Sequence, residues 1–271
     1  MKRLIQFKFF LLTIAALSLL HACQKEDGLS TSLNPGSSDS TNLKRASLRI
    51  MYGPTREFGE GSGRAWISVD RKGNPVSVGL DLSEQALKDL PSDPVALVFP
   101  FPSHAGMNFY THILLDWNPQ GHVPAGIYDV PHFDVHFYTV SNEKRMNIPR
   151  LNPPAMDVAP APEFVPPMYL QTPGLEPAMG AHWIDLLSPE FHGGTFTSTF
   201  VWGSYQGQFI FWEPMVTLAY LSSHPNDVKH LRQPLNYKRE GWYAQDYQVS
   251  YSADDQKFII ALLNLEHHEN R

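Results

Sequence analysis

The chain has 271 residues with 21 Lys and Arg against 27 Asp and Glu, a formal net charge of −6. These charges form no long runs, which excludes the basic stripe of a nucleic-acid-binding protein and a polybasic surface for anionic lipid. A hydrophobic fraction of 42% suffices for a packed core, and 23 prolines with 18 glycines favour strands joined by turns over long helices.

Residues 1–22 have the features of a secretory signal peptide. A basic start precedes an apolar run over 9–20 that is too short for a comfortable membrane span. The segment leads into the letters LHAC, which resemble a bacterial lipobox with His21 in an unusual position. This resemblance implies a lipoprotein signal peptide and lipidation of Cys23, the single cysteine of the chain. A buried cysteine in an N-terminal strand is the alternative.

Residues 23–45 are expected to be the lipidated cysteine and a tether. Gln-Lys-Glu-Asp at 24–27 resembles the signal that sends lipoproteins to the cell surface in some Gram-negative groups, and 28–42 are too poor in apolar groups to fold. We therefore expect an outer-membrane lipoprotein on the periplasmic or cell-surface face. Its partner is outer-membrane lipid, through acylated Cys23. A nucleic-acid partner is not expected, and homo-oligomer formation is left open.

Residues 46–271 are expected to form a single β-rich domain. A strand over 47–52 and a hairpin of 64–69 with 76–80 come first, followed by a short helix over 83–90 that Ser83 caps. Two further strands, 95–101 and 110–117, lead into a central strand. These successive strands predict an antiparallel sheet.

The segment 147–177 is dense in proline, which cannot supply a regular ladder. We interpret it as a long ordered loop that wraps the sheet; a linker between domains is the alternative. Two hairpins follow, with strands over 195–202 and 208–212 and over 246–251 and 258–265. Roughly eight to ten strands with few short helices predict a mainly β fold, a single antiparallel β-sandwich or barrel, with a cupin-like form among the options.

The central strand, 130–138, reads VPHFDVHFY. Alternation places His132, Asp134 and His136 on one face and aromatic or apolar side chains on the other. Residues two apart on a strand are separated by roughly 6.7 Å, so neighbouring pairs can share a metal. All three meet one ion only if the strand is sharply bent or bulged.

His182 is the best candidate for a more distant ligand. The pair His132 and Asp134 matches the first two members of a two-histidine, one-carboxylate triad, which His182 would complete. Asp185 is a candidate to orient its imidazole from outside the ligand shell. A surface histidine beside a buried tryptophan is the alternative.

Glu213 follows Phe209 and Phe211 on what the alternation predicts to be one strand face. A carboxylate there is costly unless it is paired or bound to a cation, which makes Glu213 a candidate ligand or catalytic base. The alternative is that Pro214 ends the strand and Glu213 faces solvent. His122 is a weaker candidate for the same site.

Common catalytic motifs are absent: no nucleophile elbow, phosphate-binding loop, dinucleotide fingerprint or cysteine zinc pattern occurs. The sharpest hypothesis is a divalent transition metal (Zn, Fe, Mn or Cu) in one pocket formed by His132, Asp134, His136, His182 and Glu213. Whether the protein is an enzyme is left open. The alternatives are a metal-dependent hydrolase or oxygenase, and a structural or oligomeric surface protein whose histidines form only a hydrogen-bond network.

Three stretches together resemble a known family. Residues 116–138, 179–190 and 196–215 read DWNPQGHVPAGIYDVPHFDVHFY, MGAHWIDLLSPE and FTSTFVWGSYQGQFIFWEPM. In this order they resemble the TTHB-like family of uncharacterised exported bacterial proteins, a domain of unknown function, over the chain from about Ala46 onward. The resemblance implies a β-rich domain in a secreted or lipid-anchored protein, with no established reaction.

Overall fold

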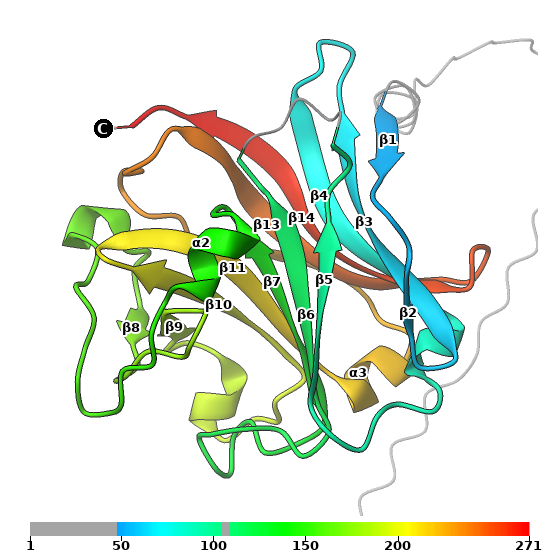
Figure 1. Cartoon of the computed structure of the whole chain (residues 1–271), viewed down its shortest axis with the longest axis horizontal. Coiled ribbons are helices and arrows are strands. Elements are labelled where there is room, and N and C mark those ends of the chain that lie inside the picture. Colours follow the sequence, from blue (N-terminus) through cyan, green and yellow to red (C-terminus); the bar gives the residue numbers. More distant parts are fainter. Residues whose placement is uncertain (1–47, 104–108, 271) are drawn as a thin grey trace, which may run out of the picture.

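The computed structural model describes residues 48–103 and 109–270 (Figure 1). The predicted signal peptide, the lipidated Cys23 and the tether lie outside the described residues and stay predictions. Within the described part, no helix has the length and apolar character needed to cross a membrane.

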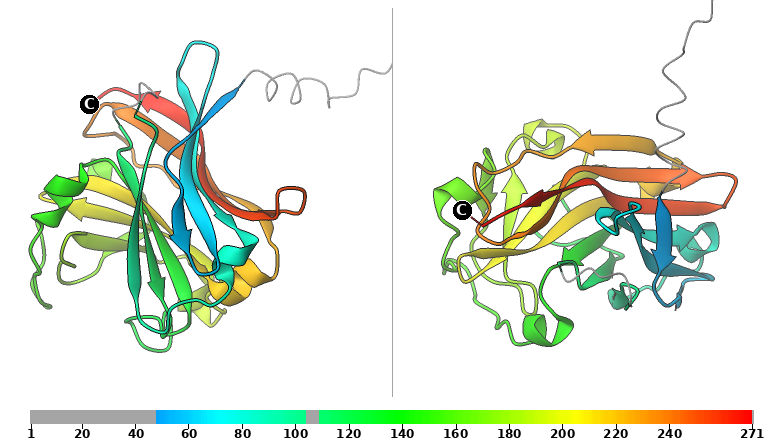
Figure 2. Two further views of the ribbon diagram at one scale, coloured as in Figure 1. Left: turned by 45° about the vertical axis from the view of Figure 1, so that its right-hand side comes forward. Right: turned by 90° about the horizontal axis from the view of Figure 1, so that it is seen from above.

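In residues 48–103 and 109–270, fourteen strands form two antiparallel sheets of seven strands each, which pack as a sandwich and do not close into a barrel (Figure 2). We call them sheet A and sheet B. Sheet A has the order β1-β3-β4-β14-β13-β12, with β2 paired to β3. Its strands are β1 (Arg49–Tyr52), β2 (Arg56–Phe58), β3 (Gly61–Val69), β4 (Pro75–Ser83), β12 (Asn226–His230), β13 (Gly241–Ser252) and β14 (Lys257–His268).

Sheet B, green and yellow in Figure 1, carries the candidate site and has the order β5-β6-β7-β11-β10-β9-β8. Its strands are β5 (Val95–Pro100), β6 (His112–Asn118), β7 (His132–Tyr138), β8 (Tyr169–Gln171), β9 (Ala181–Asp185), β10 (Ser198–Tyr205) and β11 (Gln208–Thr217). The short helices are α2 (Asn142–Met146) and α3 (Leu218–Ser222), with 3₁₀ turns at Glu84–Leu87, Pro162–Phe164 and Pro189–His192.

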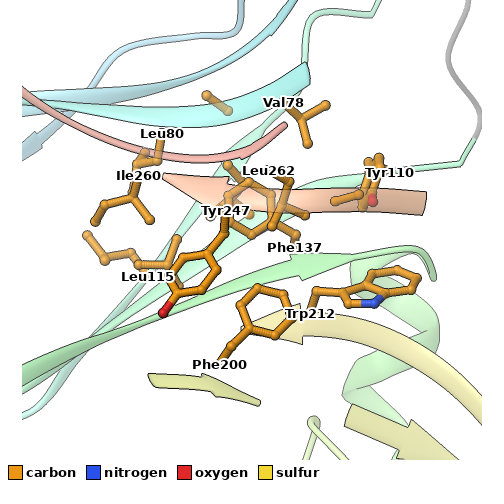
Figure 3. Close-up of a cluster of buried hydrophobic side chains, with 14 of the residues drawn as sticks. Val78, Leu80, Tyr110, Leu115, Phe137, Phe200, Trp212, Tyr247, Ile260 and Leu262 are labelled. Atoms are coloured by element: carbon orange, nitrogen blue, oxygen red, sulfur yellow. The ribbon is translucent and has the colours of Figure 1, made fainter. Parts of the chain in front are cut away.

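The main core lies between the two sheets (Figure 3). Leu80 and Leu262 of sheet A meet Phe137 and Trp212 of sheet B there, and all four side chains are buried. Because each strand of sheet B alternates, its second face carries the other half of its side chains. The predicted antiparallel β-sandwich is confirmed, and the barrel alternative is not.

The predicted hairpins are confirmed, whereas the helix expected over 83–90 is only the four-residue 3₁₀ turn Glu84–Leu87. Ser83 does not cap this turn, since its hydroxyl accepts a hydrogen bond from the Ser62 backbone at 3.0 Å. The proline-rich segment is mainly loop, as predicted, but it contributes β8 at the edge of sheet B.

Two apolar clusters cover the second face of sheet B and leave a polar row between them. One packs Ile148 and Met179 onto Phe211, and the other packs Tyr128 and Phe196 onto the far end of the sheet. Most of these covering side chains come from connections that precede or follow the strands. The polar side chains of β7 are therefore buried, although they point away from the main core.

Candidate metal centre

His132, Asp134 and His136 lie on one face of β7, as the alternation predicts. Their exposed fractions are 0%, 5% and 1%. β7 pairs with β6 in unbroken register from His132 to Tyr138, so the strand is not bulged and the two histidines cannot bind one ion together. The expected single five-residue pocket is instead divided into two groups.

The first group, which we call the buried triad, consists of His136, His182 and Glu213. Glu213 Oε2 lies 3.5 Å from His136 Nε2 and 3.7 Å from His182 Nε2. One ligand atom from each residue falls within 4.8 Å of the others, so the triad could hold a metal ion. His182 thus joins His136 and Glu213, two members of the predicted pocket, and does not complete the predicted triad with His132 and Asp134.

Glu213 reaches the triad because β11 runs beside β7 and continues past Pro214 to Thr217. The flanking register pairs, Trp212 with Phe137 and Met215 with Asp134, place Glu213 opposite His136. No ladder pair joins β7 at Glu213 or Pro214, as expected for a proline that lacks an N–H. The alternative in which Glu213 turns to solvent is wrong, because its exposed fraction is 2%.

Phe209 and Phe211 do not lie on one strand face as predicted, because the β10–β11 hairpin contains a bulge. The register shifts between Gly203 and Ser204. Gly203 pairs with Phe211 and Ser204 pairs with Phe209, which leaves Ile210 unpaired. Phe209 therefore packs against the main core, and Phe211 lies on the second face with Glu213.

Gly203 and Phe211 together position the two imidazoles. Gly203 pairs with His182 on one side and with Phe211 on the other, and a Cβ at Gly203 would overlap the Phe211 ring. That ring packs on His136 at 4.9 Å and on His182 at 5.4 Å between centroids. Asp185 does not orient His182, since its carboxylate pairs with Arg232 and accepts from the Leu187 backbone.

Asp116, which sequence reasoning missed, faces the Nδ1 side of the His136 ring, opposite to the Nε2 atom that faces Glu213. It pairs across β6 and β7 with Asp134, and its Oδ2 lies 3.3 Å from His136 Nδ1. Burial, with the charge of Asp134, raises the pKa of Asp116 to about 8. The signal was present in the alternation of 112–118, which puts Asp116 on the face that His136 occupies in the next strand.

Burial sets the protonation of the buried triad. It lowers the pKa of His136 to about 3 and that of His182 to about 4, so both imidazoles are neutral at neutral pH. Burial also raises the pKa of Glu213 well above its ordinary value, and the charges of Asp134 and Asp116 act in the same direction. Neutral imidazoles are the form that binds metals.

Several atoms of the buried triad lack a hydrogen-bond partner: both ring nitrogens of His136, Glu213 Oε2 and the facing Asp116 Oδ2. An unpaired buried polar group costs about 1–3 kcal/mol. Tetrahedral ligands at about 2.0–2.1 Å from zinc lie about 3.3 Å from one another. The separations of 3.5 and 3.7 Å are thus near those of atoms that share one ion.

The second group, which we call the loop triad, consists of His122, His132 and Asp134. His132 Nε2 lies 3.1 Å from Asp134 Oδ1, and His122 Nε2 lies 3.3 Å from Asp134 Oδ2. This group also meets the geometric condition for holding a metal ion, and the described residues contain two such groups. His122, the weaker candidate from sequence, is therefore a full member of the second group.

Comparisons with protein-family models, with curated proteins and with solved structures find no match to this chain. The resemblance to the TTHB-like family therefore stays a prediction.

Proposed function

We propose that the protein is an exported, lipid-anchored binding protein for a divalent transition-metal ion, held by the buried triad. The observation that supports metal binding is the convergence of two imidazole nitrogens and one carboxylate oxygen within 4.8 Å, most of them without another partner. Export and anchoring are supported by the composition of residues 1–27.

The donor set restricts the kind of ion. Two imidazole nitrogens and a carboxylate oxygen suit Zn, Fe, Mn or Cu and not a hard cation such as Ca²⁺, which takes six or more oxygens. Asp116 would accept a hydrogen bond from His136 Nδ1, which directs the Nε2 lone pair of His136 toward the ion.

A metal-dependent enzyme is the second candidate. Three protein ligands leave a fourth position for water or substrate, as in catalytic zinc sites, and the His182 side chain is 20% exposed. When Glu213 binds the ion it cannot also act as a free general base. The catalytic role predicted for Glu213, as a base beside the ion, therefore needs an ion that other ligands hold, and it stays a prediction.

Metal stoichiometry tests the proposal. The protein is purified without a polyhistidine tag, stripped with a chelator, dialysed against Zn²⁺ and subjected to elemental analysis. We expect His182→Asn and Glu213→Gln each to bind one ion fewer per chain than the wild type. His112→Asn is the matched control, since His112 is a buried histidine of the same sheet that has no carboxylate partner.

Thermal unfolding gives an independent measurement. A ligand at a free concentration of 100 Kd stabilises the folded state by about 2.7 kcal/mol, which raises the Tm of a domain of this size by about 5–10 °C. The rise should be smaller in His182→Asn and intact in His112→Asn. An unchanged zinc stoichiometry in both His182→Asn and Glu213→Gln would refute the proposal.

A further inference from the structure

We propose that the loop triad of His122, His132 and Asp134 is a second, independent site for a divalent transition-metal ion. It shares no ligand with the buried triad, so neither site depends on the other.

In both histidines of the loop triad, the contacts of Nδ1 determine which ring nitrogen faces Asp134. His122 Nδ1 lies 2.7 Å from the Val123 carbonyl oxygen, and His132 Nδ1 lies 2.7 Å from the Val130 carbonyl oxygen. A carbonyl oxygen only accepts, so each Nδ1 must carry the hydrogen. Each Nε2 atom then faces Asp134, with a lone pair where the ring is neutral and with an N–H where the ring is protonated.

Lone pairs that face a carboxylate repel it unless a positive charge lies between them. A proton supplies this charge best along a nearly linear N–H···O hydrogen bond, and the bond weakens steeply at angles below about 120°. His132 Nε2 and Asp134 Oδ1 are 3.1 Å apart, yet neither atom has a hydrogen-bond partner. A metal ion instead lies off the line that joins its ligands, and ligands about 2.0–2.1 Å from the ion are about 3.0–3.3 Å apart.

The surroundings of the loop triad are those of ligands held in place for an ion. Asn118 Nδ2 donates a hydrogen bond to Asp134 Oδ2 at 2.8 Å, which orients the carboxylate. Backbone carbonyls hold both imidazoles, as is usual for histidine ligands. The Phe196 ring packs on His132 at 5.4 Å and closes that side of the triad.

The spacing along β7 keeps the two ions apart. His132 and Asp134 serve one triad and His136 serves the other, so the sites are roughly 7–10 Å apart at ~3.3 Å per residue. A two-metal centre that shares a bridging oxygen needs ions about 3.5–4 Å apart. The sites are therefore two mononuclear sites, and a dinuclear centre is not expected.

Exposure distinguishes the two sites. The His122 side chain is 38% exposed on the connection between β6 and β7, whereas the most exposed side chain of the buried triad, His182, is 20% exposed. Solvent thus reaches the ion of the loop triad directly. We expect this ion to exchange faster, and to leave first when a chelator is added.

The experiment uses the whole protein without a polyhistidine tag, loaded with Zn²⁺. The wild type should bind two zinc ions per chain and release them to a chelator in two phases. His122→Asn should bind one and lose the fast phase, His182→Asn should bind one and lose the slow phase, and the double variant should bind none. His230→Asn is the control for an exposed histidine beside a carboxylate, since its Nδ1 lies 3.0 Å from Asp246.

Asp134→Asn is the second variant and should also bind one ion, with circular dichroism to check that it is folded. Two ions retained in both His122→Asn and Asp134→Asn would overturn the second site. So would a wild type with a single ion that both variants keep. A single ion lost in His122→Asn but kept in His182→Asn would instead support the loop triad and refute the buried triad.

Discussion

Gly203 provides a test of how the fold positions the buried triad. Gly203→Ala would place a methyl group against the Phe211 ring, which packs on both His136 and His182. The backbone at Gly203 is not in the left-handed region, so the effect comes from the added side chain and not from backbone strain. We expect the variant to fold with lower stability and to bind zinc at the buried triad more weakly.

The size of the effect follows from the overlap. Carbon atoms pack favourably at about 3.5–4.0 Å, so the Phe211 ring must retreat by more than about 1 Å. Overpacking of this kind costs about 1–3 kcal/mol. Metal ligands must lie within about 0.2 Å of their ideal distances. If binding must restore the ring to its place, most of this free energy opposes binding and the affinity falls by about 5- to 150-fold.

Competition with a chromophoric chelator measures the zinc affinity, and denaturant unfolding measures the stability. Gly79→Ala is the matched control, because Gly79 lies in β4 of sheet A, where an added Cβ would overlap the Trp66 ring. This control should lose stability in the same range and bind zinc as the wild type does. The difference between the two variants isolates the site from general destabilisation.

Two results would refute this reasoning. In the first, Gly203→Ala is destabilised but binds zinc with wild-type affinity, which would mean that Phe211 does not couple Gly203 to the imidazoles. In the second, Gly79→Ala loses as much affinity as Gly203→Ala, which would mean that zinc binding reports only the global stability of the fold.

Three further predictions concern other groups. Asp116→Asn should weaken zinc binding at the buried triad by about 10- to 100-fold with unchanged stoichiometry, measured by chelator competition, because it removes the carboxylate behind His136. Burial lowers the pKa of His112 to about 4. In the metal-free protein the unfolded chain therefore binds more protons between about pH 6.5 and 4, so acid should lower the free energy of unfolding, and less so in His112→Gln. Lys257→Met should cost about 3 kcal/mol in denaturant unfolding by leaving the buried Asp81 carboxylate, 2.8 Å from Lys257 Nζ, without its cation; Asp81→Asn in the same chain should recover most of the loss.

The alternation of β7 was readable from sequence because a two-residue period depends only on local geometry. The spacing along a strand also predicted that His132 and His136 are too far apart to share an ion, and the unbroken register of β7 confirms this prediction. The rule failed at Phe209 and Phe211, since a bulge shifts the faces of one strand without a clear sequence signal. Alternation along a strand is therefore a good guide only where the ladder is regular.

The partners of each ligand were not predictable in the same way. Cross-strand neighbours depend on strand order, and β11 lies beside β7 although three strands separate them in the chain. This long-range pairing brings Glu213 to His136 and carries His182 along through β10 and β9. Spacing in the sequence suggested His132 and Asp134 for His182 because it contains no information on strand order.

β12, Asn226–His230, was missed because it is an edge strand with mostly exposed side chains and no apolar alternation. His122 was underweighted for a related reason. It lies on a connection, where no period predicts the direction of a side chain, and only the folded loop brings it to Asp134.

The buried carboxylates discriminate between a metal centre and a structural hydrogen-bond network. Asp81 is buried, and Lys257 supplies its positive charge. Among the described residues, the buried carboxylate oxygens that lack a hydrogen-bond partner belong to Asp116, Asp134 and Glu213, and no lysine or arginine forms an ion pair with these three.

A structural network would satisfy these oxygens with donors, because a buried polar group without a hydrogen-bond partner is costly to the fold. Here the groups nearest to them are imidazole nitrogens, and in the loop triad each Nδ1 donates to a backbone carbonyl, so each Nε2 faces Asp134. Ligand atoms that converge with so few hydrogen bonds among them fit a metal ion better than a hydrogen-bond network. Removal of metal should therefore destabilise this face of sheet B more than any single histidine substitution does.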